Sequence, residues 1–491
     1  MSDQSATPAA TTADYGVLRW LVAATFIVIL NETVMFNALP SLRTEFDVSL
    51  TTAQWLSTAF MLTMAVVIPV TGWFLQRVTT RQAFGTAMAV FCTGTLLAAV
   101  APTFPVLLAA RIVQGSGTAV MMPLLMTTLM TIVAPQDRGR IMGNVTLAMS
   151  VAPALGPTFS GLIIDNLSWR WMFGLVLPIA GGIAVVGLSR LRNVGKRSGG
   201  SVHVPSMLVS AIGFGSLVYG LSQLGNPTAS HAKAWAFVVT GVVFVAVFAL
   251  LQLRLQRTGA PLLDLRTLGH RTYRLGLITM AAAFAGMFGS MLILPTYLQG
   301  ARELTPFQTG LLTMPGGLAM GLLGPRVGRW FDRFGARRLV VPGGLGMVLS
   351  LGILTTQISL TTPIWLVLVA HVLMMVSLAL VFTPVFTLAL GDVPPHLYSH
   401  ASSLLGTLQQ VAGAMGVAIV ATLISARTTS LVADGKDLAT ASVGAMTWAF
   451  GFGAILAVVV LALLARLPNR PATPPHGAAP DDLLPETAQS S

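Results

Sequence analysis

Residues 17–40 read V-L-R-W-L-V-A-A-T-F-I-V-I-L-N-E-T-V-M-F-N-A-L-P, and this run decides the fold of the chain. It is long enough to cross a bilayer as a helix, which needs about 20 apolar residues. Glu32 lies halfway along the run. A carboxylate at that depth costs roughly 2.5–3.5 kcal/mol on insertion scales, so such a residue usually faces the protein interior and has a function there.

Similar apolar runs recur through all 491 residues, of which 54% are hydrophobic and only 9% charged. A soluble domain carries about 25% charged residues, so the composition indicates an all-α polytopic membrane protein. Fourteen helical spans are predicted, at residues 17–40, 53–75, 82–101, 104–133, 141–165, 169–190, 206–224, 232–254, 272–298, 306–328, 337–357, 362–391, 399–425 and 440–466. Among the sixteen acids, only Glu32 falls deep inside one of these spans.

The positive charges are distributed unequally between the two sides of the predicted membrane. The connections on one side hold only six of the 28 basic residues, namely Arg43, Arg170, Lys233, Arg302, Arg427 and Lys436. The positive-inside rule therefore places the opposite connections and both termini in the cytoplasm. The same rule explains the net charge of +12 without nucleic acid as a partner.

Two basic connections divide the chain. Residues 190–205 are basic and Gly/Ser-rich, as expected of a flexible linker, and residues 255–271 form the second connection. The predicted domains are a cytoplasmic tail, a six-helix bundle, a linker region with two extra spans, a second six-helix bundle and a disordered tail, at residues 1–16, 17–190, 191–271, 272–466 and 467–491.

A short motif occurs twice at matching places. The sequence from Gly72 to Arg81 is G-W-F-L-Q-R-V-T-T-R, and the sequence from Gly328 to Arg337 is G-R-W-F-D-R-F-G-A-R. Plain positive-inside anchoring would explain either copy alone. Because the copies follow the second and the tenth predicted spans, they favour a transporter built from paired bundles.

These turns resemble the loop signature G-x-x-x-D-R-x-G-x-R/K of the major facilitator superfamily. The second copy matches well, whereas the first has Gln76 for the acid and Thr79 for the second Gly. The resemblance implies that Asp332 serves in gating and that an acid-dependent latch is missing from the first copy. The gating residues that it implies are Gly72, Arg77, Arg81, Gly328, Asp332, Arg333, Gly335 and Arg337.

The fourth span contains the other charge predicted inside the membrane. Arg111, Gln114, Gly115 and Thr118 follow the spacing i, i+3, i+4, i+7 and share one helix face. A buried Arg needs an acceptor, and the only deep acid is Glu32. The alternative is that Arg111 bonds backbone carbonyls or extends to the interface. The segment resembles the R-x-x-Q-G motif of the superfamily, in which the Arg is associated with proton coupling.

The fifth span is rich in Gly and Pro. Ala148, Ala152, Gly156 and Ser160 recur every four residues and predict a small-residue ridge for a neighbouring helix. The segment resembles the antiporter signature G-P-x-x-G-G, with Ser160 in place of one Gly, and the resemblance favours export over uptake. Ordinary helix packing is the alternative. The residues concerned are Pro153, Gly156, Pro157 and Gly161.

The first and thirteenth spans resemble a subgroup, the 14-span drug:proton antiporters, and within it the lincomycin-resistance-type exporters. L-N-E-T at 30–33, closed by A-L-P at 38–40, matches an N-E-T variant of the first span, and residues 398–416 match the thirteenth. The substrate cavity is predicted to include Asn31, Thr33, Phe36, Asn37, Gln114, Thr118, Gln409 and Gln410. His400 is expected at the cytoplasmic end of the thirteenth span, where water satisfies it.

The function predicted from these features is proton-coupled export of amphipathic drugs or antibiotics by alternating access, with Glu32 and Arg111 as the coupling residues. The resemblance implies that the protein lies in a bacterial-type cytoplasmic membrane and that it is a monomer. There is no Walker A loop and no metal or nucleophile constellation, so a transporter without cofactor, driven by the proton gradient, is expected rather than an enzyme. The alternatives are an exporter of a dedicated metabolite or lipid, an uptake symporter, and a non-transporting receptor or scaffold.

Overall fold

The computed structural model describes residues 12–48, 50–134, 137–194, 203–224, 229–257 and 261–470, and within these ranges it contains helices and no strand. The tail predicted to be disordered begins at residue 467, and its residues 471–491 lie outside these ranges, as does part of the first linker. The long helices are α1 (Thr12–Glu45), α2 (Leu50–Arg77), α3 (Thr80–Ala99), α4 (Phe104–Ile132), α5 (Arg138–Asn166), α6 (Trp171–Arg190), α7 (Val204–Leu224), α8 (His231–Leu255), α9 (Arg271–Thr296), α10 (Pro306–Phe334), α11 (Arg337–Gln357), α12 (Ile364–Gly391), α13 (Tyr398–Ala433) and α14 (Leu438–Leu464). Three short elements are η2 (Leu265–Gly269), η3 (Tyr297–Ala301) and η4 (Pro395–Leu397).

The fourteen α-helices correspond in order to the fourteen predicted spans. Helix α1 is longer at both ends than the predicted run, because helix ends need not be apolar. Short connections with local caps separate the helices. Thr79 with Gln82 forms a capping box that starts α3, and Thr305 with Gln308 forms another that starts α10, where Pro306 occupies the first turn.

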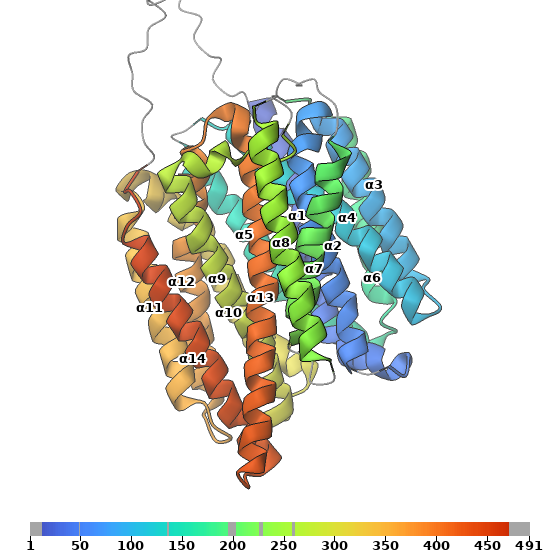
Figure 1. Cartoon of the computed structure of the whole chain (residues 1–491), viewed down its shortest axis with the longest axis vertical. Coiled ribbons are helices and arrows are strands. Elements are labelled where there is room, and N and C mark those ends of the chain that lie inside the picture. Colours follow the sequence, from blue (N-terminus) through green and yellow to red (C-terminus); the bar gives the residue numbers. More distant parts are fainter. Residues whose placement is uncertain are drawn as a thin grey trace, which may run out of the picture.

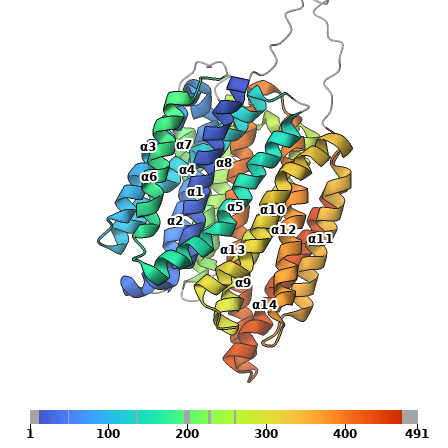
Figure 2. The ribbon, with the colours of Figure 1, turned by 180° about the vertical axis from the view of Figure 1, so that it is seen from behind.

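The helices form two bundles with a hairpin between them in sequence. Helices α1–α6 pack on one another, and so do α9–α14. The bundles meet along two seams, α5 against α10 and α2 against α13. The α7–α8 hairpin lies over the second seam, where α7 contacts both α2 and α13 (Figure 1). Figure 2 shows α5 and α10 side by side on the opposite face.

Twelve helices in the described part of the chain are long and apolar enough to span a membrane. The other two, α5 and α10, carry small residues where they face each other. A Cβ at Gly143 would lie 2.8 Å from Cα of Pro325, and a Cβ at Gly161 would lie 3.2 Å from Cα of Phe307. Their mutual contact buries part of each helix, so the pair needs less apolar surface.

The outer surface is apolar, as a bilayer requires. Val185 on α6, Leu250 on α8 and Ile455 on α14 are 70%, 62% and 64% exposed. Large apolar side chains exposed over so many helices indicate contact with lipid. Together with the twelve spans, they show a multi-pass membrane protein.

The two ends of the molecule differ in charge. We call the end with Arg77, Arg138, Arg254 and Arg337 the basic end; the described chain begins and ends there (Figure 1). At the opposite end, α13 reaches beyond its neighbours. It is the longest helix described, with 36 residues.

Candidate functional site

Glu32 lies in the interior of the first bundle. Glu32 is only 8% exposed to solvent, and its neighbours Asn31 and Thr33 are 2% and 5% exposed. The Oε1 atom of Glu32 is buried and has no hydrogen-bond partner among the residues that the structure describes. Burying a carboxylate oxygen without a partner is costly, so the ionised form of Glu32 is unfavourable at this place unless a positive charge lies close to it.

Arg111 of α4 is completely buried and joins three helices. Its Nη1 donates to Oδ1 of Asn31 at 3.1 Å and to Oε1 of Gln114 at 3.0 Å, and its Nε donates to the carbonyl of Leu56 at 3.3 Å. The guanidinium also lies 4.1 Å from the ring centroid of Phe60. The planar guanidinium of an arginine carries several N–H donors in a fixed arrangement, so Arg111 can bind several acceptors at once.

The network continues into α3. Gln114 Nε2 donates to Thr95 Oγ1 at 2.9 Å, and Thr95 Oγ1 donates to the carbonyl of Phe91 at 2.8 Å. Arg111 and Gln114 therefore act on the same face of α4, and their hydrogen bonds tie α1, α2, α3 and α4 together. Hydrogen bonds that link buried polar groups in this way make a site more rigid.

The expected ion pair between Arg111 and Glu32 is not formed. Among the described residues, the side-chain acceptors of Arg111 are Asn31 and Gln114, and Nη2 of Arg111 has no partner. Successive helix residues point about 100° apart, and on α1 it is Asn31, not its neighbour Glu32, that accepts a hydrogen bond from Arg111. Arg111 is still close enough to interact electrostatically with Glu32.

Other predicted cavity residues support this network. Thr33 faces α5, where a Cβ at Gly156 would lie 3.0 Å from Cβ of Thr33. Its hydroxyl donates to the carbonyls of Ile29 and Leu30. Thr118 is buried and donates to the carbonyl of Gln114 at 3.0 Å. Asn31, Thr33, Gln114 and Thr118 thus line the bundle interior around Glu32.

Two amides on α13 lie near the seam with the first bundle. Gln409 is 6% exposed and Gln410 is half-buried. Within the described part of the chain, Nε2 of Gln409 and Oε1 of Gln410 have no hydrogen-bond partner. Ser402 and Ser403 contact the first bundle. Gln409 and Gln410 follow them by seven residues, about two helical turns, and therefore lie on the same faces of α13 as these serines. The side chains of Phe36, Asn37 and Pro157 lie outside the described part of the structure, and Pro153 is half-buried in α5.

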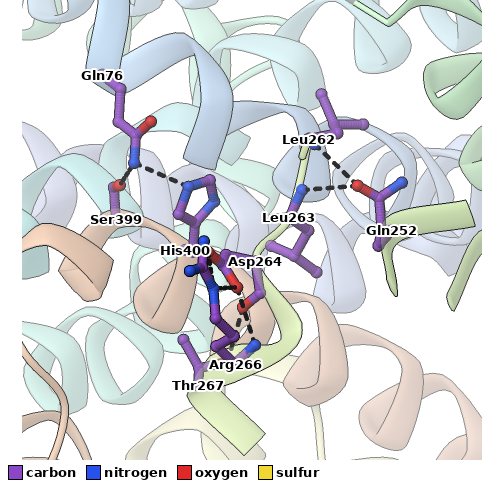
Figure 3. A network of polar contacts seen from close by, with 9 residues as sticks. All are labelled: Gln76, Gln252, Leu262, Leu263, Asp264, Arg266, Thr267, Ser399 and His400. Atoms are coloured by element: carbon purple, nitrogen blue, oxygen red, sulfur yellow. Dashed lines mark hydrogen bonds and ion pairs between the residues drawn. The ribbon is translucent and has the colours of Figure 1, made fainter. Parts of the chain in front are cut away.

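The two loop motifs reach across the two seams in the same way. Asp332 Oδ2 accepts from the backbone amide of Arg140 at 2.9 Å, at the start of α5. Its counterpart Gln76 lies within 3.2 Å of Ser399 Oγ and 2.8 Å of His400 Nε2, at the start of α13 (Figure 3). In each copy, the residue at the acid position of the motif therefore holds its own bundle to the opposite bundle. In the first copy this residue carries an amide instead of a carboxylate.

The other motif residues shape these turns. Gly72 allows close approach, since a Cβ there would lie 3.1 Å from His400 Nδ1. Gly335 has a φ of 79°, which glycine tolerates best. Arg77 lies 4.5 Å from the ring centroid of Trp73. The backbone amide of Arg81 donates to Asn193, and Gly328 is buried. The guanidinium of Arg333 lies over the ring of Phe334. Arg337 donates to the carbonyl of Ala465 through its side chain and to Asn469 through its backbone amide.

His400 is buried at 4% exposure, contrary to the expectation that water reaches it. The residues that cover it include the segment after α8, which carries Leu262, Asp264 and Arg266 (Figure 3). Asp264 pairs with Arg266 at 2.7 Å, and its hydrogen bond raises the pKa of Arg266. Sequence reasoning missed this contact because it joins segments that are more than 130 residues apart.

Further hydrogen bonds close the basic end between the bundles. Thr71 Oγ1 lies 2.9 Å from Ser403 Oγ, and Thr127 Oγ1 lies 3.0 Å from Ser402 Oγ. Arg138 donates to the Tyr398 hydroxyl at 3.2 Å. We call this set, together with the contacts of Gln76 and Asp332, the basic-end gate.

The comparisons with known proteins agree with this architecture. A profile of the Major Facilitator Superfamily matches residues 21–417. The chain belongs to this superfamily. It is 34% identical to the uncharacterized MFS-type transporter YcnB of Bacillus subtilis, over 92% of this chain and 95% of that protein. It is 35% identical to the lincomycin resistance protein LmrB of Listeria innocua, over 91% and 95%.

Solved structures of this superfamily have the same fold. The human organic anion transporter MFSD10 superposes with a TM-score of 0.65 at 15% identity, over 92% of this chain and 99% of that one. The proton:xylose symporter XylE superposes with a TM-score of 0.63 at 14% identity, over 94% and 97%. The major facilitator fold is therefore confirmed, and the chain is a membrane transporter of small molecules.

Proposed function

We propose that this protein is a proton-coupled secondary exporter of amphipathic drugs or antibiotics. The names of its relatives support the substrate class, since LmrB is a lincomycin resistance protein and a 29% identical Mycobacterium tuberculosis relative is a multidrug resistance protein B homolog. The observation that carries the coupling is the buried Oε1 of Glu32, unpartnered beside the Arg111 network. An intramembrane acid without an ion-pair partner is suited to exchange a proton for another cation.

In this mechanism the two bundles rock about the central site and open it to one side at a time. The basic-end gate is closed in the structure, and the positive-inside rule assigns this end to the cytoplasm. Protons from the opposite side reach Glu32 and neutralise it. The loss of charge weakens the hold of Glu32 on a cationic or polar substrate and changes its interaction with Arg111.

Coupling follows because proton and substrate compete for Glu32 or prefer different conformations. A ligand shifts a conformational equilibrium only by its difference in affinity for the two states. Arg111 stays fixed by Asn31, Gln114 and the Leu56 carbonyl. The proton on Glu32 is then the variable charge of the site.

The test is dye and lincosamide transport in inside-out vesicles under an imposed pH gradient, with wild type compared to Glu32→Gln at matched protein levels. Glu45→Gln is the matched control, since Glu45 ends the same helix and forms an exposed pair with Arg170 at 3.3 Å. Glu32→Gln is expected to bind substrate but to lose proton-driven accumulation, whereas Glu45→Gln retains it. Undiminished transport by Glu32→Gln would overturn the proposal.

The same vesicles separate the proposal from other functions. Substrate accumulation driven by a proton gradient of the opposite sign would establish an uptake symporter. A protein that neither transports nor moves protons when substrate is added would be a receptor or scaffold.

A further inference from the structure

A cavity of about 540 Å³ lies at the basic end, where α11 begins. It is lined by Arg337, Arg338, Val341, Pro342 and Asn469. The first four residues belong to the first turns of α11, and Asn469 belongs to the segment that follows α14. All of them except the half-buried Val341 are exposed. Helices α11 and α14 pack together at one flank of the molecule (Figure 1), so the cavity opens to the surroundings of the protein.

The two arginines of the cavity carry positive charges that no carboxylate neutralises within the described part of the chain. The ion pairs found there involve other arginines. Arg470, directly after Asn469, is exposed as well and adds a third positive charge nearby. Guanidinium groups bind phosphate through parallel N–H donors. The cavity is therefore suited to a phosphate group.

One side of the cavity is held in place by hydrogen bonds. The backbone amide of Arg337 donates to Oδ1 of Asn469 at 3.0 Å, and Nη2 of Arg337 donates to the carbonyl of Ala465 at 3.2 Å. The guanidinium of Arg338 lies 6.0 Å from the ring centroid of Phe334. Side chains that are already positioned lose less freedom when a ligand binds.

Beyond the arginines, α11 exposes an apolar stripe. Arg338, Pro342, Leu345 and Leu349 follow the spacing i, i+4, i+7, i+11 and share one helix face. Leu345 and Leu349 are 54% and 58% exposed. At a rise of 1.5 Å per residue they lie about 10 and 16 Å from Arg338 along the helix. Half of a hydrocarbon core of about 30 Å is about 15 Å, so the stripe covers the depth of one leaflet.

We propose that this cavity binds an anionic phospholipid of the cytoplasmic leaflet, with its phosphate at Arg337 and Arg338 and an acyl chain along the stripe. Basic pockets on the cytoplasmic side of membrane helices bind the head groups of anionic lipids, and the positive-inside rule assigns the basic end to that side. A free phosphate would contact the arginines but not Leu345 or Leu349, so the stripe favours the lipid. The inference does not depend on proton coupling or on the exported substrate.

Native mass spectrometry of the purified full-length protein in detergent tests the inference. Dioleoyl phosphatidylglycerol and dioleoyl phosphatidylcholine are titrated in turn, because they share their acyl chains and differ in the charge of the head group. Wild type is compared with the double variant Arg337→Gln, Arg338→Gln. Arg254→Gln, Arg257→Gln is the matched control, since both arginines are exposed at the basic end, close to the exposed Leu250 of α8 but outside the cavity.

Wild type is expected to bind its first phosphatidylglycerol at least about tenfold more tightly than phosphatidylcholine. The cavity variant should lose at least about fivefold in affinity for phosphatidylglycerol, and the α8 control less than about twofold. Equal losses in both variants would show a general attraction to positive charge and would overturn the inference. Equal binding of the two lipids by wild type would also overturn it.

A second measurement needs no variant. Phosphatidylglycerol with a diazirine in one acyl chain is photolysed on the wild-type protein, and the labelled peptides are mapped. The segment from Pro342 to Leu349 should be labelled at least about fivefold more than with the corresponding phosphatidylcholine. Equal labelling of this segment by both lipids would contradict the site.

Two further samples separate other occupants of the cavity. Glycerol 3-phosphate that displaces the lipid at equal concentration would show a site for soluble phosphate, and the inference would fail. The other sample neutralises the acids of the C-terminal tail by Asp481→Asn, Asp482→Asn and Glu486→Gln. If only this variant prefers phosphatidylglycerol, the tail of the chain occupies the cavity in the wild type, which would overturn the inference.

Discussion

Asp332 of α10 accepts a hydrogen bond from the backbone amide of Arg140 at the start of α5, at 2.9 Å, across the seam between the bundles. A carboxylate at this place meets the positive end of the α5 dipole, which is worth about 0.3–1 kcal/mol at exposed sites. This contact stabilises the closed basic end, and in the proposed alternating access it must break when the bundles separate there.

Asp332→Ala is expected to loosen the gate more than Asp332→Asn, because Asn keeps an acceptor while Ala keeps none. The measurement is the rate at which Ser402→Cys, in a Cys92→Ser background, reacts with a membrane-impermeant thiol reagent added from the basic end. Ser402 is 5% exposed in the closed gate. The rate should rise from wild type through Asn to Ala.

Asp437→Ala is the control for that series. Asp437 caps α14 at the opposite end by accepting from Thr440 at 2.9 Å, which lowers the pKa of Asp437. The control therefore removes an ionised helix cap of the same kind. An equal rise in Ser402→Cys reactivity would show that the effect of Asp332 is not local to the gate.

Arg111→Lys is expected to lower transport at least about tenfold at matched expression. Lysine keeps the charge but cannot hold Asn31, Gln114 and the Leu56 carbonyl at once, and each hydrogen bond to a charged group is worth about 1.5–3 kcal/mol. Initial rates in vesicles measure the loss. Arg170→Lys, at an exposed pair with Glu45, should leave transport nearly unchanged; equal losses in both would contradict the role given to the network.

Gly156→Ala is expected to destabilise the α1–α5 contact beside Glu32. The added Cβ would lie 3.0 Å from Cβ of Thr33 and closer still to its hydroxyl, and overpacking typically costs about 1–3 kcal/mol. Thermal unfolding in detergent measures the change. Thr33→Ala should partly rescue it by removing the hydroxyl and methyl groups. Gly182→Ala, where nothing lies within 4 Å, is the matched control and should not lower the melting temperature.

Gln252→Met is expected to lower the melting temperature, because the amides of Leu262 and Leu263 lose their acceptor inside the protein. The estimated cost is about 1–3 kcal/mol for each amide. Gln256→Met is the control, since the Nε2 of Gln256 has no hydrogen-bond partner among the described residues. Identical melting curves for Gln252→Met and wild type would show that the acceptor of Gln252 contributes nothing measurable to stability.

Most of the fold could be predicted from sequence, because a bilayer demands apolar helices of known length. The run around Glu32 and the repeated loop motif already indicate many spans and paired bundles. Helices α5 and α10 are less apolar. For α5, the four-residue spacing of Gly156 with the other small residues of its ridge still predicts close packing on a neighbouring helix.

The detail of the site depends on rotations that sequence does not specify. Asn31 and Glu32 are adjacent, and the packing of α1 decides which of them meets Arg111. Likewise, His400 is buried because the segment after α8 packs against it, and the sequence does not specify that contact. Local patterns identified the buried charges, whereas their partners are set by contacts between distant parts of the chain.

The length of α13 has a practical consequence. Its 36 residues extend about 54 Å, while the hydrocarbon core of a bilayer is about 30 Å thick. The helix is therefore longer than the hydrocarbon core requires, and its far end, with the tight turn into α14, extends beyond the neighbouring helices (Figure 1). A fluorophore or antibody fragment fixed there would report each rotation of that bundle in single molecules, at a distance from the path of the substrate.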